Sequence, residues 1–201
     1  MLKMKKACQV PLAEKLFEEY EVRDNHIAAN VGVDKIEDVL KHFIAMHDEP
    51  LFFILELPTN YNDETVSESG EVEVVEVYHK DVYYIDGCSQ KEALSILNRV
   101  GELLYNDGLS AFGYGCHNSG DEIMFGEYNI LTILSSNINA YSNFFEEHNI
   151  SKTDSLITAW QTFSAETPGM CGSHSVNGET IYDIPKIFEN YGMYFAERRE
   201  E

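Results

Sequence analysis

The sequence predicts an α+β domain with a mainly antiparallel central sheet flanked by helices. Segments typical of strands cluster between residues 51 and 134 of the 201-residue chain, and segments with helical spacing of apolar residues precede and follow them. Strands and helices do not alternate regularly, so parallel βαβ units are not expected. A hydrophobic fraction of 44% and a charged fraction of 24% are typical of a globular chain, and we expect residues 1–201 to form a single domain.

Residues 1–49 are expected to form a helical segment that packs on this domain. A first helix is indicated by the spacing of four apolar residues, Leu12, Leu16, Phe17 and Tyr20. A second short helix is expected over residues 24–31. Asp34 and Glu37 have the spacing of a helix-capping pair and predict a third helix after them.

Three strands are expected between residues 51 and 86. The run LFFILEL at 51–57 is apolar throughout and indicates a central strand buried on both faces. After a polar loop at 59–70, glutamate and valine alternate in EVEVVEVYH at 71–79, and the adjacent valines 74 and 75 predict a β-bulge there. Residues 81–86 are expected to form the antiparallel neighbour of that strand.

A long helix and a group of short elements follow. Ser89 and Glu92 form a capping box, and the apolar stripe behind them predicts a helix that ends at Asn106. The stretch AFGYGCHNSGDEIMFGEYN at 111–129 predicts two strands, 112–117 and 122–125, joined by a turn. The remaining expected elements are a strand at 128–134, helices at 138–148 and 154–163, a hairpin turn at 177–178, a helix at 183–192 and a strand at 193–197.

The chain is strongly acidic, with 35 Asp and Glu against 14 Lys and Arg and a formal net charge of −21. This balance argues against nucleic-acid binding, because phosphate contacts need Lys and Arg, and against adhesion to anionic membranes. No run approaches the roughly 18 apolar residues of a membrane span, and the first residues lack the apolar segment of a secretory signal. The four cysteines are widely scattered, which favours free thiols and a cytoplasmic location.

Four residues could carry catalysis or bind a metal: Cys116, His117, Cys171 and His174. Cys116 and His117 are adjacent on a predicted strand and therefore point to opposite faces, and Cys171 with His174 makes only half of a zinc site, so we expect no metal and no cofactor. A nucleophilic cysteine would need a nearby base and an orienting group. Cys116 with His174 and Asp121, or Cys171 with His117, would supply them if the fold brought them together. A hydrolase or transferase that uses such a pair is the alternative function.

Gly113, Gly115 and His117 share the other face of the predicted strand at 112–117. Two glycines at alternate positions leave a strip of bare backbone, which either lets a helix pack closely or admits a ligand. Packing is the expected use. The sequence leaves open whether this face meets a helix or lines a cleft.

Carboxylates are densest between residues 63 and 86. In a polar loop and on the exposed face of an edge-like strand they would be solvated and ionised, where they would protect a sheet edge or dock a basic partner. Two tyrosines are the expected aromatic anchors of such a docking face. The candidate binding residues are Tyr61, Asp63, Glu64, Glu68, Glu71, Glu73, Glu76, Tyr78, Asp121 and Glu122.

The segments SLITAWQTFSAETPG at 155–169 and IYDIPKIFENYGMYFAERRE at 181–200 are similar to bacterial families without an assigned biochemistry. In its size, its strong negative charge and its lack of a catalytic motif, the whole chain resembles the small acidic α+β proteins that serve as cytoplasmic immunity or antitoxin partners in bacterial toxin systems. The resemblance implies a non-enzymatic protein that docks and occludes a basic, toxin-like protein.

Overall fold

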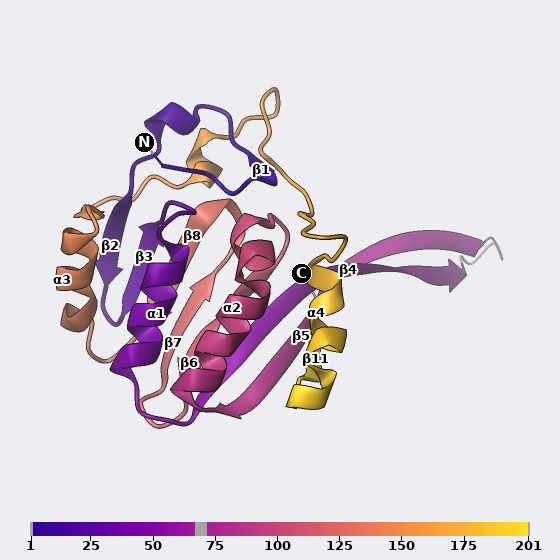
Figure 1. The fold of residues 1–201 in the computed structure, drawn as a ribbon. Helices are drawn as coiled ribbons and strands as arrows, with labels where there is room; N and C mark the ends of the chain where they lie inside the picture. Colours follow the sequence, from indigo (N-terminus) through magenta and orange to yellow (C-terminus); the bar gives the residue numbers. More distant parts are fainter. Residues whose placement is uncertain (1, 67–71, 201) are drawn as a thin grey trace.

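Figure 1 shows the computed structural model, which describes residues 2–66 and 72–200, and side chains outside residues 60–77. The described strands are β1 (Cys8–Gln9), β2 (Glu19–Arg23), β3 (His26–Asn30), β4 (Leu51–Val66), β5 (Val72–Cys88), β6 (Ala111–Cys116), β7 (Asp121–Phe125), β8 (Ile130–Leu134), β9 (Ser151–Lys152), β10 (Met170–Cys171) and β11 (Tyr194–Glu200). The described α-helices are α1 (Ile36–Met46), α2 (Gln90–Asn106), α3 (Asn139–Glu147) and α4 (Ile184–Ile187).

Nine strands form one large sheet in the order β11-β5-β4-β6-β7-β8-β3-β2-β9. The neighbouring strands in this sheet are antiparallel, with the exception of the parallel pair β2 and β9. β1 and β10 form a separate two-stranded sheet. The expected α+β class with a mainly antiparallel central sheet is therefore confirmed.

The helices cover one face of the sheet, as the ribbon in Figure 1 shows for α1 and α2. The main core joins alternate strand residues, such as Ile27, Phe53 and Phe125, to buried residues of all four helices. α3 belongs to this face as well, because its Phe145 lies against the ring of Tyr20 at a centroid distance of 4.9 Å. The sheet therefore has one face packed on helices and one face without them in the described part of the chain.

Local signals placed the central elements correctly. Ser89 caps α2 by accepting a hydrogen bond from the Glu92 amide, and the Glu92 carboxylate accepts one from the Ser89 amide in return. The hairpin of β6 and β7 pairs Gly113 with Met124 and Cys116 with Asp121, as the turn at 118–121 requires. These elements fold as expected because their signals lie within a few residues of each other.

Over its described residues 2–35, the N-terminal segment has no α-helix and only a 3₁₀ turn at Ala13–Lys15, so the prediction of a helical segment was wrong. The chain begins with strands, and β2 and β3 form a hairpin whose turn includes Asp24 in a left-handed conformation, with φ of 53°. The helical spacing of apolar residues around 12–20 is a coincidence, since Leu16 is fully buried whereas Phe17 is 55% exposed. Only α1 agrees, and it begins after Lys35 without a side-chain cap from Asp34.

The long pair β4 and β5 also differs from the expectation. Residues 59–66 continue β4 instead of forming a loop, and residues 72–88 form one strand instead of two neighbours. Val74 and Val75 pair with Glu64 and Asp63 in unbroken register, so the expected β-bulge is absent there. Beyond the sheet the two strands pair only with each other, and this ribbon projects from the body (Figure 1).

The C-terminal third contains less helix than the sequence indicated. The segment expected to be helical at 154–163 has only a 3₁₀ turn, Ala159–Thr162, and the helix expected at 183–192 is reduced to α4 with 3₁₀ turns on either side. The final strand is confirmed as β11, which pairs with β5 at the edge of the sheet. In the described residues, no helix has the length and apolar character required to cross a membrane.

Candidate functional site

The face of the sheet away from the helices carries a row of aromatic side chains. Phe52 on β4, Tyr84 on β5 and Tyr194 on β11 lie side by side on neighbouring strands, with centroid distances of 5.7 Å between Phe52 and Tyr84 and 6.3 Å between Tyr84 and Tyr194. We call these three residues the aromatic strip. Phe52 is only 7% exposed, whereas Tyr84 is half-buried and Tyr194 is 46% exposed, so the strip presents aromatic surface to solvent at its tyrosine end.

The two glycines of β6 make room for this strip. A Cβ at Gly115 would collide with the ring of Phe52, and one at Gly113 would collide with the backbone carbonyl group of Ile123 on β7. The bare backbone thus accommodates the Phe52 ring at Gly115 and the neighbouring strand at Gly113. The space over Gly115 is thus filled by an aromatic ring of the same sheet, on which His117 packs, and not by a helix.

Polar groups surround the aromatic strip. His117 packs on Phe52 at 4.6 Å between ring centroids, and its Nε2 lies 3.4 Å from Oδ1 of Asp86. The hydroxyl of Tyr194 donates a hydrogen bond of 2.6 Å to Oδ2 of Asp86, and this bond raises the pKa of Tyr194. Asp86 therefore orients Tyr194 within the strip and His117 beside it.

Carboxylates outnumber cations around the strip. Glu122 on β7 points to this face, and its pKa is raised by partial burial and by the nearby Glu56, while Arg199 acts in the opposite direction. Arg199 donates a hydrogen bond of 2.6 Å to Glu56 and is also paired with Glu197. The local balance is therefore negative, which matches the charge of the whole chain.

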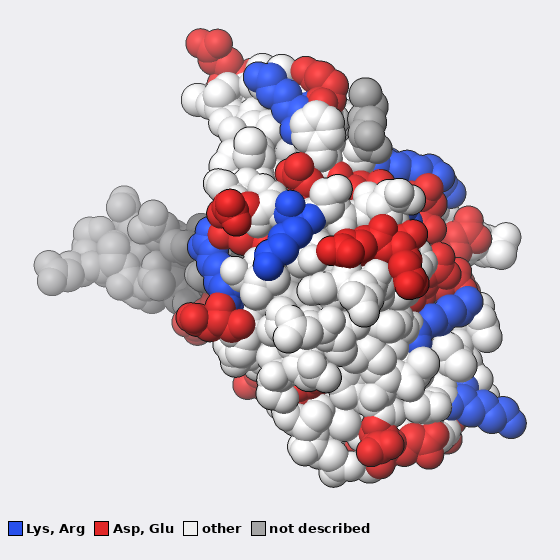
Figure 2. Space-filling view, turned by 90° about the vertical axis from the view of Figure 1, so that its left-hand side faces the viewer, with Lys and Arg blue, Asp and Glu red and all other residues white. Residues whose placement is uncertain are grey.

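The acidic ribbon of β4 and β5 holds most of the binding residues expected from the sequence. Tyr61, Asp63, Glu64, Glu73 and Glu76 lie in its paired strands, whereas Glu68 and Glu71 are outside the described residues. Tyr78, at the base of the ribbon, is 62% exposed. A space-filling view of the side that carries β2 and α3 shows acidic side chains, interspersed with Lys and Arg, around a broad uncharged area (Figure 2).

Asp121 is not part of this surface. It is only 6% exposed, and its Oδ2 accepts hydrogen bonds from Ser135 Oγ (2.6 Å) and from His47 Nε2 (3.0 Å). His47 Nδ1 faces the carbonyl oxygen of Phe43 at 2.8 Å. The expectation that Asp121 is solvated was therefore wrong, because its carboxylate is buried and hydrogen-bonded to His47 and Ser135.

The candidate catalytic pairs are not assembled. Cys116 is buried in the core near Asp48, and His117 is exposed on the opposite face, as strand alternation predicts. Cys171 and His174 lie beyond the C-terminal end of α2, where the His174 amide donates to Asp107 Oδ2. Cys116 lies near the beginning of α2, because Cys116 and Cys88 both pair with Leu51 and α2 begins at Gln90. α2 has 17 residues, so about 25 Å separates its two ends. Neither cysteine can reach the histidine proposed for it.

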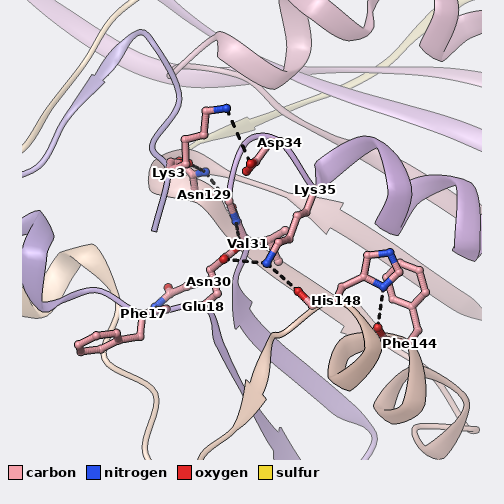
Figure 3. A network of polar contacts seen from close by, with 11 residues as sticks. Lys3, Phe17, Glu18, Asn30, Val31, Asp34, Lys35, Asn129, Phe144 and His148 are labelled. Atoms are coloured by element: carbon pink, nitrogen blue, oxygen red, sulfur yellow. Dashed lines mark hydrogen bonds and ion pairs between the residues drawn. The ribbon is translucent and has the colours of Figure 1, made fainter. Parts of the chain in front are cut away.

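Another polar cluster joins the N-terminal segment to the helices (Figure 3). Lys35 Nζ donates hydrogen bonds to Glu18 Oε2 (2.7 Å) and to the carbonyl oxygen of His148 (2.6 Å). Asn129 accepts from the Lys5 amide and donates to the carbonyl oxygens of Lys3 and Val31. These groups satisfy one another and hold loops together, so the cluster has a structural role. In the described chain, no three His, Cys, Asp or Glu residues are arranged to hold a metal ion.

No protein-family model, no curated protein and no solved structure matches this chain. The geometry of the uncovered sheet face therefore carries the functional argument. The sequence did not identify Phe52, Tyr84, Asp86 or Tyr194 as site residues. The alternation in β4 and β5 could have indicated which side chains share a face, but the absence of a covering layer is a property of the tertiary structure alone.

Proposed function

We propose that this chain is a non-enzymatic acidic binding protein that docks a basic partner protein on its uncovered sheet face. The observation that carries the proposal is the aromatic strip, which lies on a sheet face that no described helix covers and is bordered by the carboxylates of Glu56, Asp86 and Glu122. As in the immunity and antitoxin proteins that the sequence resembles, binding would occlude the partner. The proposal needs no cofactor, and it places the protein in the cytoplasm.

The two kinds of residue have different roles in this proposal. Tyrosine and other aromatic residues supply large contact areas at little cost in side-chain entropy, and they are enriched among the residues that dominate binding energies. The carboxylates and the net charge of −21 accelerate encounter with a basic protein and disfavour acidic competitors. The acidic ribbon of β4 and β5 projects beside this face and would extend the negative surface.

Calorimetry with purified basic proteins encoded next to the gene tests the proposal. A true partner should bind more weakly as salt rises from about 0.05 M to about 0.3 M, because screening shortens the range of the charges. Tyr194→Ala should weaken binding at least about tenfold if the strip is the anchor. The matched control is Phe17→Ala, since Phe17 is 55% exposed but lies just before β2, toward the opposite edge of the sheet from β11.

Two results would contradict the proposal. One is a partner whose affinity is insensitive to both salt and Tyr194→Ala. The other is the absence of binding by every basic protein encoded near the gene. Circular dichroism of each variant separates a lost contact from a lost fold.

A further inference from the structure

A second feature, far from the uncovered sheet face, is a pair of cysteines held opposite each other. β1 and β10 pair antiparallel with Cys8 directly across from Cys171. The Gly172 amide donates to the Ala7 carbonyl oxygen at 2.8 Å, which makes Cys8 and Cys171 a non-hydrogen-bonded pair. Residues opposed in this way have Cα atoms about 4.5 Å apart and side chains on the same face, within the range that a disulfide spans.

The end of α2 confirms that the two side chains are close. A Cβ at Gly108 would lie 2.8 Å from Cys8 Sγ and 2.9 Å from Cys171 Cβ, so both side chains flank the same point of the backbone. The Gly108 amide also donates to the Gly172 carbonyl oxygen at 3.0 Å. The backbone around Gly108 therefore fixes both strands, and with them the thiol pair.

The surroundings assign a different role to each thiol. The neighbouring Cys171 thiol, the Tyr128 backbone and the ammonium of Lys5 lower the pKa of Cys8 against the effect of burial. The proximity of Cys8, together with burial, raises the pKa of Cys171. Lys5 is itself buried, and its Nζ donates to the Gly126 carbonyl oxygen at 2.9 Å. These directions favour thiolate formation at Cys8, which is 7% exposed and lies beside the partly exposed Cys171.

We propose that Cys8 and Cys171 form a dithiol that reacts with hydroperoxides and closes into a disulfide. The Cys8 thiolate attacks one oxygen of the hydroperoxide and the O–O bond breaks, so that Cys8 becomes a sulfenic acid; the departing oxygen takes up the proton that Cys8 released and leaves as water or an alcohol. The Cys171 sulfur then attacks the Cys8 sulfur, loses its proton and displaces the hydroxyl group as water. Two thiols lose two electrons in total, and the hydroperoxide gains them.

The other two cysteines provide an internal control. Cys88 and Cys116 lie on opposite sides of Leu51, on the two strands that flank β4. Strands two positions apart are about 9.6 Å from each other, which is too far for a disulfide. Burial raises the pKa of Cys88 to about 11, so its thiol is a poor nucleophile at neutral pH.

Peptide mapping of the full-length chain tests the inference. The reduced protein is treated with hydrogen peroxide, alkylated in denaturant without reduction, digested and analysed by mass spectrometry. We expect one cross-linked peptide pair that joins Cys8 to Cys171, and a melting temperature higher by roughly 10 °C than that of the reduced chain, because the bond closes a very long loop. Cys116→Ala should retain the cross-link.

Cys171→Ser separates the two steps of the reaction. In this variant Cys8 should stop at a sulfenic acid that dimedone traps, and peroxide should no longer raise the melting temperature. The inference is overturned if Cys8 and Cys171 of the unaltered chain are both still alkylated after peroxide, or if Cys8 proceeds to a sulfinic acid without any cross-link. The mapping of the unaltered chain decides the matter even if a variant does not fold.

Discussion

Replacement of Asp121 by asparagine should destabilise the fold strongly. The carboxylate is buried and accepts three hydrogen bonds, from His47 Nε2 at 3.0 Å, Ser135 Oγ at 2.6 Å and the Ser136 amide at 3.3 Å. A buried donor left without its acceptor costs about 1–3 kcal/mol, and more where one partner is charged. An asparagine keeps one acceptor oxygen but weakens a network of three hydrogen bonds, so we expect a loss at the upper end, about 3 kcal/mol.

Urea unfolding followed by circular dichroism measures this loss. With a slope of about 2 kcal/mol per molar urea, the midpoint should fall by about 1.5 M. Glu122→Gln is the matched control, since it makes the same chemical change one residue away on the opposite face of β7. Because the pKa of Glu122 is raised by burial, its charge does not stabilise the fold, and the control should shift the midpoint little.

The loss should also depend on pH in a defined direction. Burial alone would raise the pKa of Asp121, but the hydrogen bonds from His47, Ser135 and the Ser136 amide lower it overall. A lowered pKa in the folded state adds stability above the unfolded pKa of about 3.9, and this stability is lost as the pH falls through the folded value. The difference between the unaltered chain and Asp121→Asn should therefore be complete at pH 6 and shrink below about pH 4. A midpoint shift at pH 6 no larger than that of Glu122→Gln would refute the reasoning.

Two further substitutions test the packing around the site. Gly115→Ala forces a methyl group into the ring of Phe52. We expect the free energy of unfolding to fall by about 1–3 kcal/mol and the melting temperature to fall by several degrees. The control is Gly120→Ala, at an open turn with φ of 73°, which should destabilise the fold less. Asn129→Ala removes hydrogen bonds to three backbone groups at a fully buried residue with φ of 65°. Calorimetry should show a free energy of unfolding lower by about 3 kcal/mol, and a decrease below about 1 kcal/mol would contradict the structural role assigned to Asn129.

The sequence predicted the secondary-structure elements correctly where the capping or turn residues lie within a few positions of the element that they begin or join. The capping pair Ser89 and Glu92 marked the beginning of α2, and the turn at 118–121 marked the hairpin of β6 and β7. In the N-terminal segment the same kind of reasoning failed. Spacing around Leu16 and Tyr20 is compatible with a helix, but Tyr20 pairs with Ala29 and packs on Phe145, and these long-range contacts select a strand.

In the candidate site, too, some features follow from the sequence and others depend on long-range packing. The negative charge of the chain, the opposite faces of Cys116 and His117 and the shared face of Gly113 and Gly115 follow from composition and from the two-residue period of a strand. The burial of Asp121 does not follow, because its partner His47 caps the C-terminal end of α1 and the contact forms only when α1 packs on the sheet.

The sequence by itself thus determined the acidic character of this protein, its α+β class and the elements whose signals are local. The tertiary structure alone decided that one face of the sheet has no helix on it in the described residues, that the aromatic strip forms there, and that Cys8 meets Cys171. The physical reason is that strand pairing and layer packing join residues distant in the chain, and a single sequence contains no local signal for which distant partner each strand takes.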